Sequence, residues 1–499
     1  MDKMEELGAS ESVEEGTLRS PRIKNLILFS SPLFGVQLAW TIQQVYGLGL
    51  LGHVKPYLSS LGFSATQLPF LILSGPLAGL IAPPVFAILS DSCQSRLGKR
   101  KPFIFGGGAA VVLSLLLLAR ARELGEVLST SFSAAGVNTL LAKMIATISI
   151  YCLNFAMQPL YLGIRAWSVD FFLPHQQPVI SLWSSRFMSL GSLFVAFVGY
   201  GSQKPSFESL AFVSAAILTA VLLLILVAAP ADTRMTPGND HRVRVQMPTS
   251  LHTHAFRLIK KIQDLPPITR HVCRTQLLAW FAWFPILQYS SSYVYEVYEA
   301  NTSLNPNTAI ARVSLMFYVA MFATNLAVPY LWRFSAKESS ESSLSEKEGN
   351  GNHSHHTRGD HVLLQTWRIC LIILAIWLLG LSLSSSRPLA VSIIFAATGV
   401  LFAIANWVPY SLISQEISSR SKLRHECEGD DHELEHEDSG SDTARLLAIH
   451  NMSITVPQIL FSLASATLLS ILGRLGTRLD VSWIFLMSIP AAVLSAWLV

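Results

Sequence analysis

Hydrophobic residues in this chain gather in long runs that short polar stretches separate. A helix needs about 20 mainly apolar residues to cross the hydrocarbon core of a bilayer. Reading the chain with a window of that length predicts twelve membrane-spanning helices. They cover approximately residues 27–50, 67–89, 103–121, 140–166, 179–201, 210–229, 275–295, 309–332, 363–383, 389–413, 445–470 and 481–499. The second span is rich in glycine and proline, so we expect it to be the least regular.

Composition agrees with this pattern. The 499 residues are 51% hydrophobic and only 14% charged, whereas a soluble domain carries roughly a quarter charged residues. The formal net charge of +4 is too small and too scattered for nucleic-acid binding. The first 26 residues are polar and contain no short basic segment leading into an apolar one, so no cleavable signal peptide is expected. The sequence predicts an all-α membrane protein in a lipid bilayer.

The spans divide into two equal sets. We predict a disordered tail over 1–26, a six-helix bundle over 27–229, a basic linker over 230–274 and a second six-helix bundle over 275–499 with flexible loops at 335–361 and 417–443. Lys and Arg concentrate in the linker and in the loop after the second span, which predicts cytoplasmic termini. Two bundles of six helices are typical of secondary transporters of the major facilitator type, whose solute site lies between the halves.

The loop at 417–443 also contains several His, Asp and Glu residues. Such a composition could hold a divalent metal. Their spacing is not that of a metal site, which favours a solvated loop without a metal.

Polar side chains inside a span are costly and mark either a pathway or a helix contact. In the fourth span, Asn154, Gln158, Tyr161 and Arg165 follow one helical face. This stripe donates and accepts hydrogen bonds and ends on a fixed positive charge, as a polyhydroxylated solute requires. The alternative is a helix–helix contact sealed by polar pairs. Arg165 favours the first interpretation, because an unpaired arginine at that depth is hard to explain otherwise.

Three other spans carry comparable faces, and sugar rings stack on aromatic side chains. We therefore place Trp40, Gln43 and Gln44 of the first span, Trp283 of the seventh, and Asn451 and Gln458 of the eleventh beside the fourth-span residues as candidate binding groups. Trp and Tyr also gather at membrane interfaces, so each aromatic residue keeps that alternative. Asp91 precedes Arg96 and Arg100. We expect these residues to form an ion pair that holds one end of the pathway closed; the alternative is that the basic residues only determine the orientation of the chain in the membrane.

Several segments resemble the sucrose and α-glucoside permeases of the glycoside–pentoside–hexuronide:cation symporter family, fungal members in particular. The loop SDSCQSRLGKRKPFI (90–104) is similar to that family's SDxxxSRxGRRRPFI, and RAWSVDFFLPHQQ (165–177) is similar to its R-A-x-x-V-D-x-x-P-x-H-Q-Q. The segments WTIQQVYG (40–47), AWFPILQYSSSYVYEVY (282–298), NWVPYSLISQE (406–416) and VPQIL (456–460) also fit. The resemblance covers most of the chain apart from the tail and loops.

The resemblance implies twelve helices, alternating access and transport of sucrose, maltose or a related α-glucoside, commonly with a proton as the coupling ion. Two departures bear on that proton: Gln43 stands where the family has glutamate, and Asn154 where it usually has an acid. An amide cannot titrate, which favours an uncoupled facilitator as the alternative to symport. Asp170 remains, and we expect it to stabilise a gate together with Asp91, Arg96 and Arg100.

The sequence therefore predicts a membrane carrier and no enzyme, with no resident cofactor, that acts as a monomer on a disaccharide or glycoside. We expect it in the plasma membrane, with the vacuolar membrane as the alternative. A sugar sensor that binds without transporting is the second functional class. Labelled uptake separates the two.

Overall fold

The computed structural model describes residues 21–44, 57–64, 67–91, 97–130, 136–201, 206–228, 264–343, 354–427, 442–474 and 481–499, with Cys93 and Ser95 as single positions. Within these ranges, the side chains of Asp91, of Asp442 and of residues 329–360 and 423–427 lie outside the description. The predicted tail and most of the predicted linker also lie outside it.

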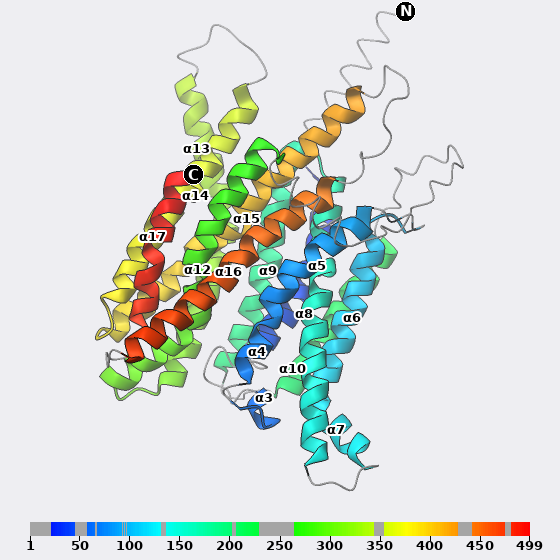
Figure 1. The fold of residues 1–499 in the computed structure, drawn as a ribbon. Coiled ribbons are helices and arrows are strands. Elements are labelled where there is room, and N and C mark those ends of the chain that lie inside the picture. The colour runs from blue at the N-terminus through cyan, green and yellow to red at the C-terminus, as the bar shows by residue number, and fades with distance from the viewer. Residues whose placement is uncertain are drawn as a thin grey trace, which may run out of the picture.

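All regular structure in the described ranges is helical, and each predicted span corresponds to one long helix (Figure 1). The first half contains α2 (Ile23–Ile42), α5 (Ser74–Asp91), α6 (Lys101–Ala119), α8 (Val137–Phe171), α9 (Gln177–Tyr200) and α10 (Phe207–Ala228). The second contains α12 (Pro267–Asn301), α13 (Pro306–Ser343), α14 (Ser354–Ser382), α15 (Pro388–Cys427), α16 (Asp442–Arg474) and α17 (Ser482–Leu498). The predicted all-α membrane architecture is confirmed.

Ten of the described helices are long and apolar enough to cross a membrane by length and composition alone. The two others are α12 and α17. The helix α17 has 17 residues, and α12 carries the polar run from Gln288 to Ser292. A helix with a polar stripe in a membrane protein turns that stripe towards protein or water rather than lipid.

Helices occupy parts of both predicted flexible loops. Within 335–361, α13 continues through Ser343 and α14 begins at Ser354, and within 417–443, α15 continues through Cys427. The extension of α13, SAKESSESS, is mostly serine with Ala, Lys and Glu between, and that of α15, ISSRSKLRHEC, mixes serine with Arg, Lys, Leu and Glu; of these, all but serine have high intrinsic helix propensity, as does alanine. Hydropathy detects only the part of a helix that matches the bilayer, so these polar continuations escape it. The stretch 428–441, which contains most of the His- and acid-rich segment, lies outside the described residues.

The second span is irregular, as predicted. A short helix, α4 (Leu68–Ile72), precedes α5, and the helix breaks at Leu73. The Oγ of Ser74 donates to the carbonyl of Leu71 at 2.5 Å across this break. The break lets the Ser74 side chain serve the candidate site described below.

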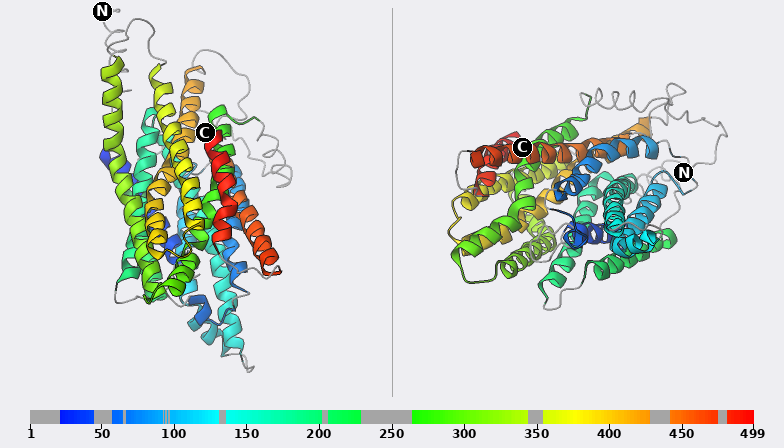
Figure 2. Two further views of the ribbon diagram at one scale, coloured as in Figure 1. Left: turned by 90° about the vertical axis from the view of Figure 1, so that its left-hand side faces the viewer. Right: turned by 60° about the horizontal axis from the view of Figure 1, so that its bottom comes forward.

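The two halves meet along a few helix pairs. Helix α5 packs against α16, and α9 packs against α13 and α15; Figures 1 and 2 show α5 and α16 running side by side. Gly79 permits the close approach of α5 to α16, because a Cβ there would lie 2.7 Å from Oγ1 of Thr455. Each half also has its own apolar core, and Phe86 and Leu162 of the first half join the core of the second.

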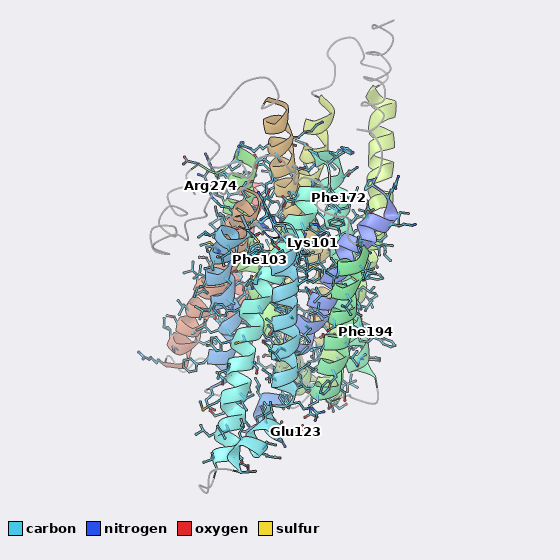
Figure 3. The ribbon with its side chains drawn as sticks, turned by 90° about the vertical axis from the view of Figure 1, so that its right-hand side faces the viewer. Lys101, Phe103, Glu123, Phe172, Phe194 and Arg274 are labelled. Carbon is cyan, nitrogen blue, oxygen red and sulfur yellow. The ribbon has the colours of Figure 1, made fainter. Side chains whose placement is uncertain are left out.

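One end of the bundle is strongly basic. Lys99, Arg100 and Lys101 lie there, after a turn at Gly98 whose φ of 90° favours glycine. Figure 3 shows Lys101 and Phe172 towards this end and Glu123 at the opposite end. We call this end of the molecule the basic end.

The opposite end is formed in part by α3 (Tyr57–Ser60) and α7 (Ala121–Ser129). The hydroxyl of Tyr57 donates to the carbonyl of Ala119 at 3.1 Å. Burial, together with the nearby charge of Glu208, raises the pKa of Tyr57 to about 12. This hydroxyl therefore remains a donor throughout the physiological pH range.

Candidate functional site between the two halves

Side chains from both halves meet in three successive layers, starting from the basic end. In the outermost layer, Oγ of Ser418 on α15 donates to the carbonyl of Phe172, which follows α8, at 3.1 Å. The short helix η2 (Pro174–Gln176) packs on α15 beside it. These contacts join the two halves at the basic end.

The second layer is a stack of Arg165 on Tyr410. The guanidinium of Arg165 lies 4.1 Å from the ring centroid of Tyr410 on α15 and 5.3 Å from that of Tyr161 on its own helix. Its Nη2 also donates to the Tyr161 hydroxyl at 3.2 Å. Arg165 is buried, and no described carboxylate pairs with it. Aromatic faces therefore stabilise this cation in place of an acid.

The third layer lies about 10 Å further from the basic end along α8, at 1.5 Å per residue. Here Nδ2 of Asn451 on α16 donates to Oε1 of Gln158 at 3.3 Å and to the carbonyl of Gly79 at 3.2 Å. Asn451 thus contacts two helices of the other half at once. The structure brings together Gln158 and Asn451, two residues that the sequence predicted as binding groups.

Asn154 lies one helical turn beyond this layer. Its Nδ2 donates to Oγ of Ser74 at 3.0 Å and to the carbonyl of Ile150 at 2.9 Å. Both amide hydrogens are therefore used within the first half. Asn154 does not contact Arg165 in this arrangement, although the two share one face of α8.

Gln43 is 0% exposed, and neither its Oε1 nor its Nε2 has a hydrogen-bond partner among the described residues. A buried amide without partners costs on the order of 1–3 kcal/mol. Such groups in native proteins mark a site that a water or a ligand completes. Gln44 is half-buried beside it, and Trp40 is 42% exposed.

The remaining predicted binding residues lie in the second half. Trp283 is only 2% exposed and packs against Phe402 at 5.3 Å between ring centroids, with no described partner for its Nε1. In this conformation its ring is covered by protein. Gln458 is half-buried on α16, two turns beyond Asn451. The structure does not bring these two residues into contact with the third layer.

The predicted gating residues form a contact within the first half. Nε of Arg100 donates to Oδ2 of Asp170 at 2.8 Å, and its Nη1 donates to Oγ of Ser90 at 2.6 Å. This ion pair ties the start of α6 to the end of α8. The Asp91 side chain and Arg96 lie outside the described residues.

Glu416, the acid nearest the end of the tenth predicted span, is also engaged. Its carboxylate accepts hydrogen bonds from the backbone N–H groups of Ile268 and Thr269, at 3.1 and 2.7 Å, and from the Thr269 hydroxyl at 2.7 Å. It caps the N-terminus of α12, where the helix dipole favours a negative charge.

Two residues at the interface escaped the sequence interpretation. Tyr410 lies within the segment 406–416 that carries the family resemblance, but no periodicity marks it as the partner of Arg165. His450 immediately precedes Asn451, and its ring lies 4.6 Å from that of Tyr410 at 90°. The sequence signal that could have identified His450 is its position directly before Asn451, a predicted binding residue.

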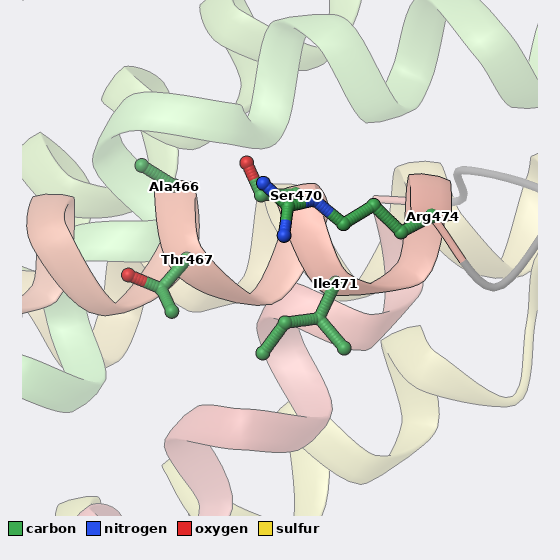
Figure 4. Close-up of a pocket in the computed structure, with 5 residues that line it drawn as sticks. All are labelled: Ala466, Thr467, Ser470, Ile471 and Arg474. Carbon is green, nitrogen blue, oxygen red and sulfur yellow. The ribbon is translucent and has the colours of Figure 1, made fainter.

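A surface hollow of about 350 Å³ lies elsewhere, at the far end of α16, between Ala466 and Arg474 (Figure 4). The residues that line it are Ala466, Thr467, Ser470, Ile471 and Arg474, all from one helix. Its nearest residue is 15 positions from Asn451, about 22 Å along the helix. It is separate from the layered contacts between the halves.

Comparisons with known proteins address the family. No protein-family model matches this chain. The general alpha-glucoside permease of Schizosaccharomyces pombe is 26% identical, over 95% of this chain and 92% of that protein. The sucrose transport protein SUC4 of Arabidopsis thaliana is 24% identical, over 88% of this chain and 83% of its own length. The sucrose transport protein SUT5 of Oryza sativa is 25% identical, over 67% of this chain and 66% of that protein.

Solved structures address the fold. A D-xylose-proton symporter superposes with a TM-score of 0.55 and 14% identity, over 95% of this chain and 97% of that one. The E. coli fucose:proton symporter FucP gives a TM-score of 0.55 with 12% identity, over 95% and 98%. The predicted major facilitator fold is confirmed. The predicted resemblance to the sucrose and α-glucoside permeases is confirmed as well, by relatives that match nearly the whole chain.

Proposed function

We propose that this protein is a secondary transporter that moves sucrose, maltose or a related α-glucoside across a membrane by alternating access. The observation that carries the proposal is the contact of two amides across the interface between the halves, where Asn451 donates to Gln158. In the first half, both polar atoms of the buried Gln43 have no described protein partner. Sugar hydroxyls supply both donors and acceptors and match such a set.

The layers suggest how the cycle proceeds. In this conformation, Ser418 and Phe172, then Arg165 and Tyr410, close the basic end. Sugar enters from the opposite end and bonds to the amides of the third layer and to Asn154. Rocking of one bundle against the other then separates the two outer layers and releases the sugar at the basic end.

The orientation follows from charge. Lys and Arg near the ends of membrane helices are retained in the cytoplasm, so the basic end is the cytoplasmic end and both termini are cytoplasmic. The plasma membrane is the location that we propose, with a monomer as the transport unit. Sugar then enters from outside the cell in the conformation described here.

The coupling ion is a separate question. The family resemblance implies symport with a proton. A proton needs a titratable group that changes its surroundings during the cycle, and the two family positions for it hold Gln43 and Asn154. Of the described acids near the interface, Asp170 pairs with Arg100 and Glu416 caps α12. Another group must carry the proton if the transporter is coupled.

Uptake of labelled sucrose and labelled maltose into yeast cells that lack their own α-glucoside carriers tests the proposal. We expect saturable uptake of at least one sugar, and competition by other α-glucosides that ranks the substrates. Binding without accumulation would identify a sensor instead. Absence of both binding and uptake, with the protein present in the membrane, would contradict the proposal. The matched control is Asn451→Leu, which removes the amide that joins the halves.

A further inference from the structure

His450 is a titratable side chain that the proposed cycle leaves unused. It is 0% exposed on α16, and its Nδ1 has no hydrogen-bond partner among the described residues. It precedes Asn451, which bonds directly to the other half. The imidazole therefore lies within the closed interface, one residue from the contact that holds the halves together.

Hydrogen bonding defines the charge of this imidazole in the closed conformation. Nε2 of His450 lies 3.5 Å from Nε2 of Gln276 on α12. With the amide in this orientation its nitrogen donates, so the histidine nitrogen accepts and the ring is neutral in this arrangement. A second proton on the ring would place two donors against each other and remove this hydrogen bond.

A single tyrosine ring separates His450 from the cation of the other half. The His450 ring lies 4.6 Å from the Tyr410 ring, and the Arg165 guanidinium lies 4.1 Å from the same ring. His450 and Arg165 are therefore within about 9 Å of each other, one from each half. A positive charge on His450 would face a like charge across the interface that must separate when the basic end opens.

The other ionisable groups around His450 do not offset this repulsion. Towards the basic end, the helices packed against α16 carry Arg165, Tyr161 and Asp170 on α8, Tyr410 and Glu416 on α15, and Cys273, Arg270, His271 and Arg274 on α12, with Arg445 on α16 itself. Asp170 is paired with Arg100. Glu416 is bonded to the start of α12, and Cys273 contacts Ser453. Helix α5 contributes only Asp91, whose side chain lies outside the description.

We propose that His450 is a proton-binding site that controls the gate at the basic end: the neutral ring keeps this gate closed, and its protonation opens it. The inference rests on the proposed transport cycle, in which that gate must open once per turn. At an effective dielectric constant of about 20, two unit charges about 9 Å apart repel enough to shift an equilibrium roughly twentyfold. Loss of the Gln276 hydrogen bond adds to this shift.

Distances between spin labels at the basic end test the proposal without any sugar flux. Labels on Lys99→Cys of the first half and Ser421→Cys of the second report gate opening, since both positions are exposed at this end. The native cysteines at 93, 152 and 427 are replaced by serine, and the buried Cys273 and Cys370 are retained. Measurements in lipid nanodiscs at pH 8 and pH 5.5 bracket the usual titration range of histidine.

We expect the gate of the protein with His450 in place to shift by up to roughly tenfold towards the longer, open distance between pH 8 and pH 5.5, the most that a group with an ordinary histidine pKa can give over this range. His450→Gln keeps a hydrogen-bonding group that does not titrate, so the gate of this variant should remain closed at both pH values. His450→Arg, whose side chain stays charged in proteins, should favour the open distance even at pH 8. His271→Gln, a histidine outside the Arg165–Tyr410 stack, should respond to pH as the unmodified protein does.

A pH response retained in full by His450→Gln would overturn the proposal, and so would a closed gate in His450→Arg at pH 8. The two proposals fail in different experiments. Absence of sugar uptake in cells would reject the transport function and leave the gate measurement valid. An unresponsive gate in a protein that transports sugar would reject only the role of His450.

Discussion

Replacing Tyr410 by leucine removes the aromatic face that joins Arg165 of the first half to the second half. The guanidinium lies 4.1 Å from this ring in a buried setting, and a desolvated cation–π contact of that kind contributes about 2 kcal/mol. Arg165 keeps its contact with Tyr161, so the net loss is about 1–2 kcal/mol. The closed state of the basic-end gate should therefore lose roughly five- to thirtyfold in population relative to the open state.

Spin labels on Lys99→Cys and Ser421→Cys measure that population directly, at a pH of 8 where His450 stays neutral. Tyr410→Leu should raise the open fraction, whereas Tyr410→Phe retains a ring face and should stay close to the unmodified protein. Equal effects of the leucine and phenylalanine variants would show that the hydroxyl, and not the ring face, matters. An unchanged distance in Tyr410→Leu would refute the assignment of this stack as a gate.

Three further substitutions test neighbouring parts of the account. Asn154→Asp should make sugar uptake rise as pH falls, because only the protonated acid can donate as the amide does; a flat pH profile of uptake would count against this. Gly79→Ala should lower stability by about 1–3 kcal/mol, because the new Cβ clashes with Thr455 at the α5–α16 contact. Adding Thr455→Ala should relieve the clash, and Gly106→Ala should show no such loss, because a Cβ there meets no atom within 4 Å. Thermal unfolding of the single and double variants measures the coupling. Glu416→Ala should lower stability by about 1–2 kcal/mol through the loss of the α12 cap, with Glu416→Gln affected less, and equal melting temperatures would contradict that role.

The positions of the twelve spans could be predicted from the apolar pattern, because lipid imposes both a minimum length and an apolar surface on each helix. The ends of α13 and α15 could not, since Lys, Glu and Arg continue a helix without any change that hydropathy detects. The irregular second span was predictable from its glycine and proline content. That its break would present Ser74 to Asn154 was not, because the two residues are 80 positions apart.

Residue identity predicted the polar face of α8 but not its partners. Gln158 does meet Asn451 across the interface, and spacing alone identified both residues as candidates. Among the described residues, Arg165 packs on the face of Tyr410 and pairs with no acid, and its predicted contact with sugar stays a prediction. A sequence pattern reports which residues share a helix face, whereas contacts between halves depend on how two bundles dock.

The central claim is that sugar crosses between the two halves and is bound there by amides. Counterflow of labelled sucrose and maltose into liposomes that contain the purified protein tests it most directly, with Gln158→Leu as the paired variant. We expect saturable counterflow by the unmodified protein and a KM raised about tenfold or more by Gln158→Leu, as expected when a ligand loses one or two hydrogen bonds. Folded protein that carries neither sugar, or a Gln158→Leu variant with unchanged kinetics, would contradict the claim.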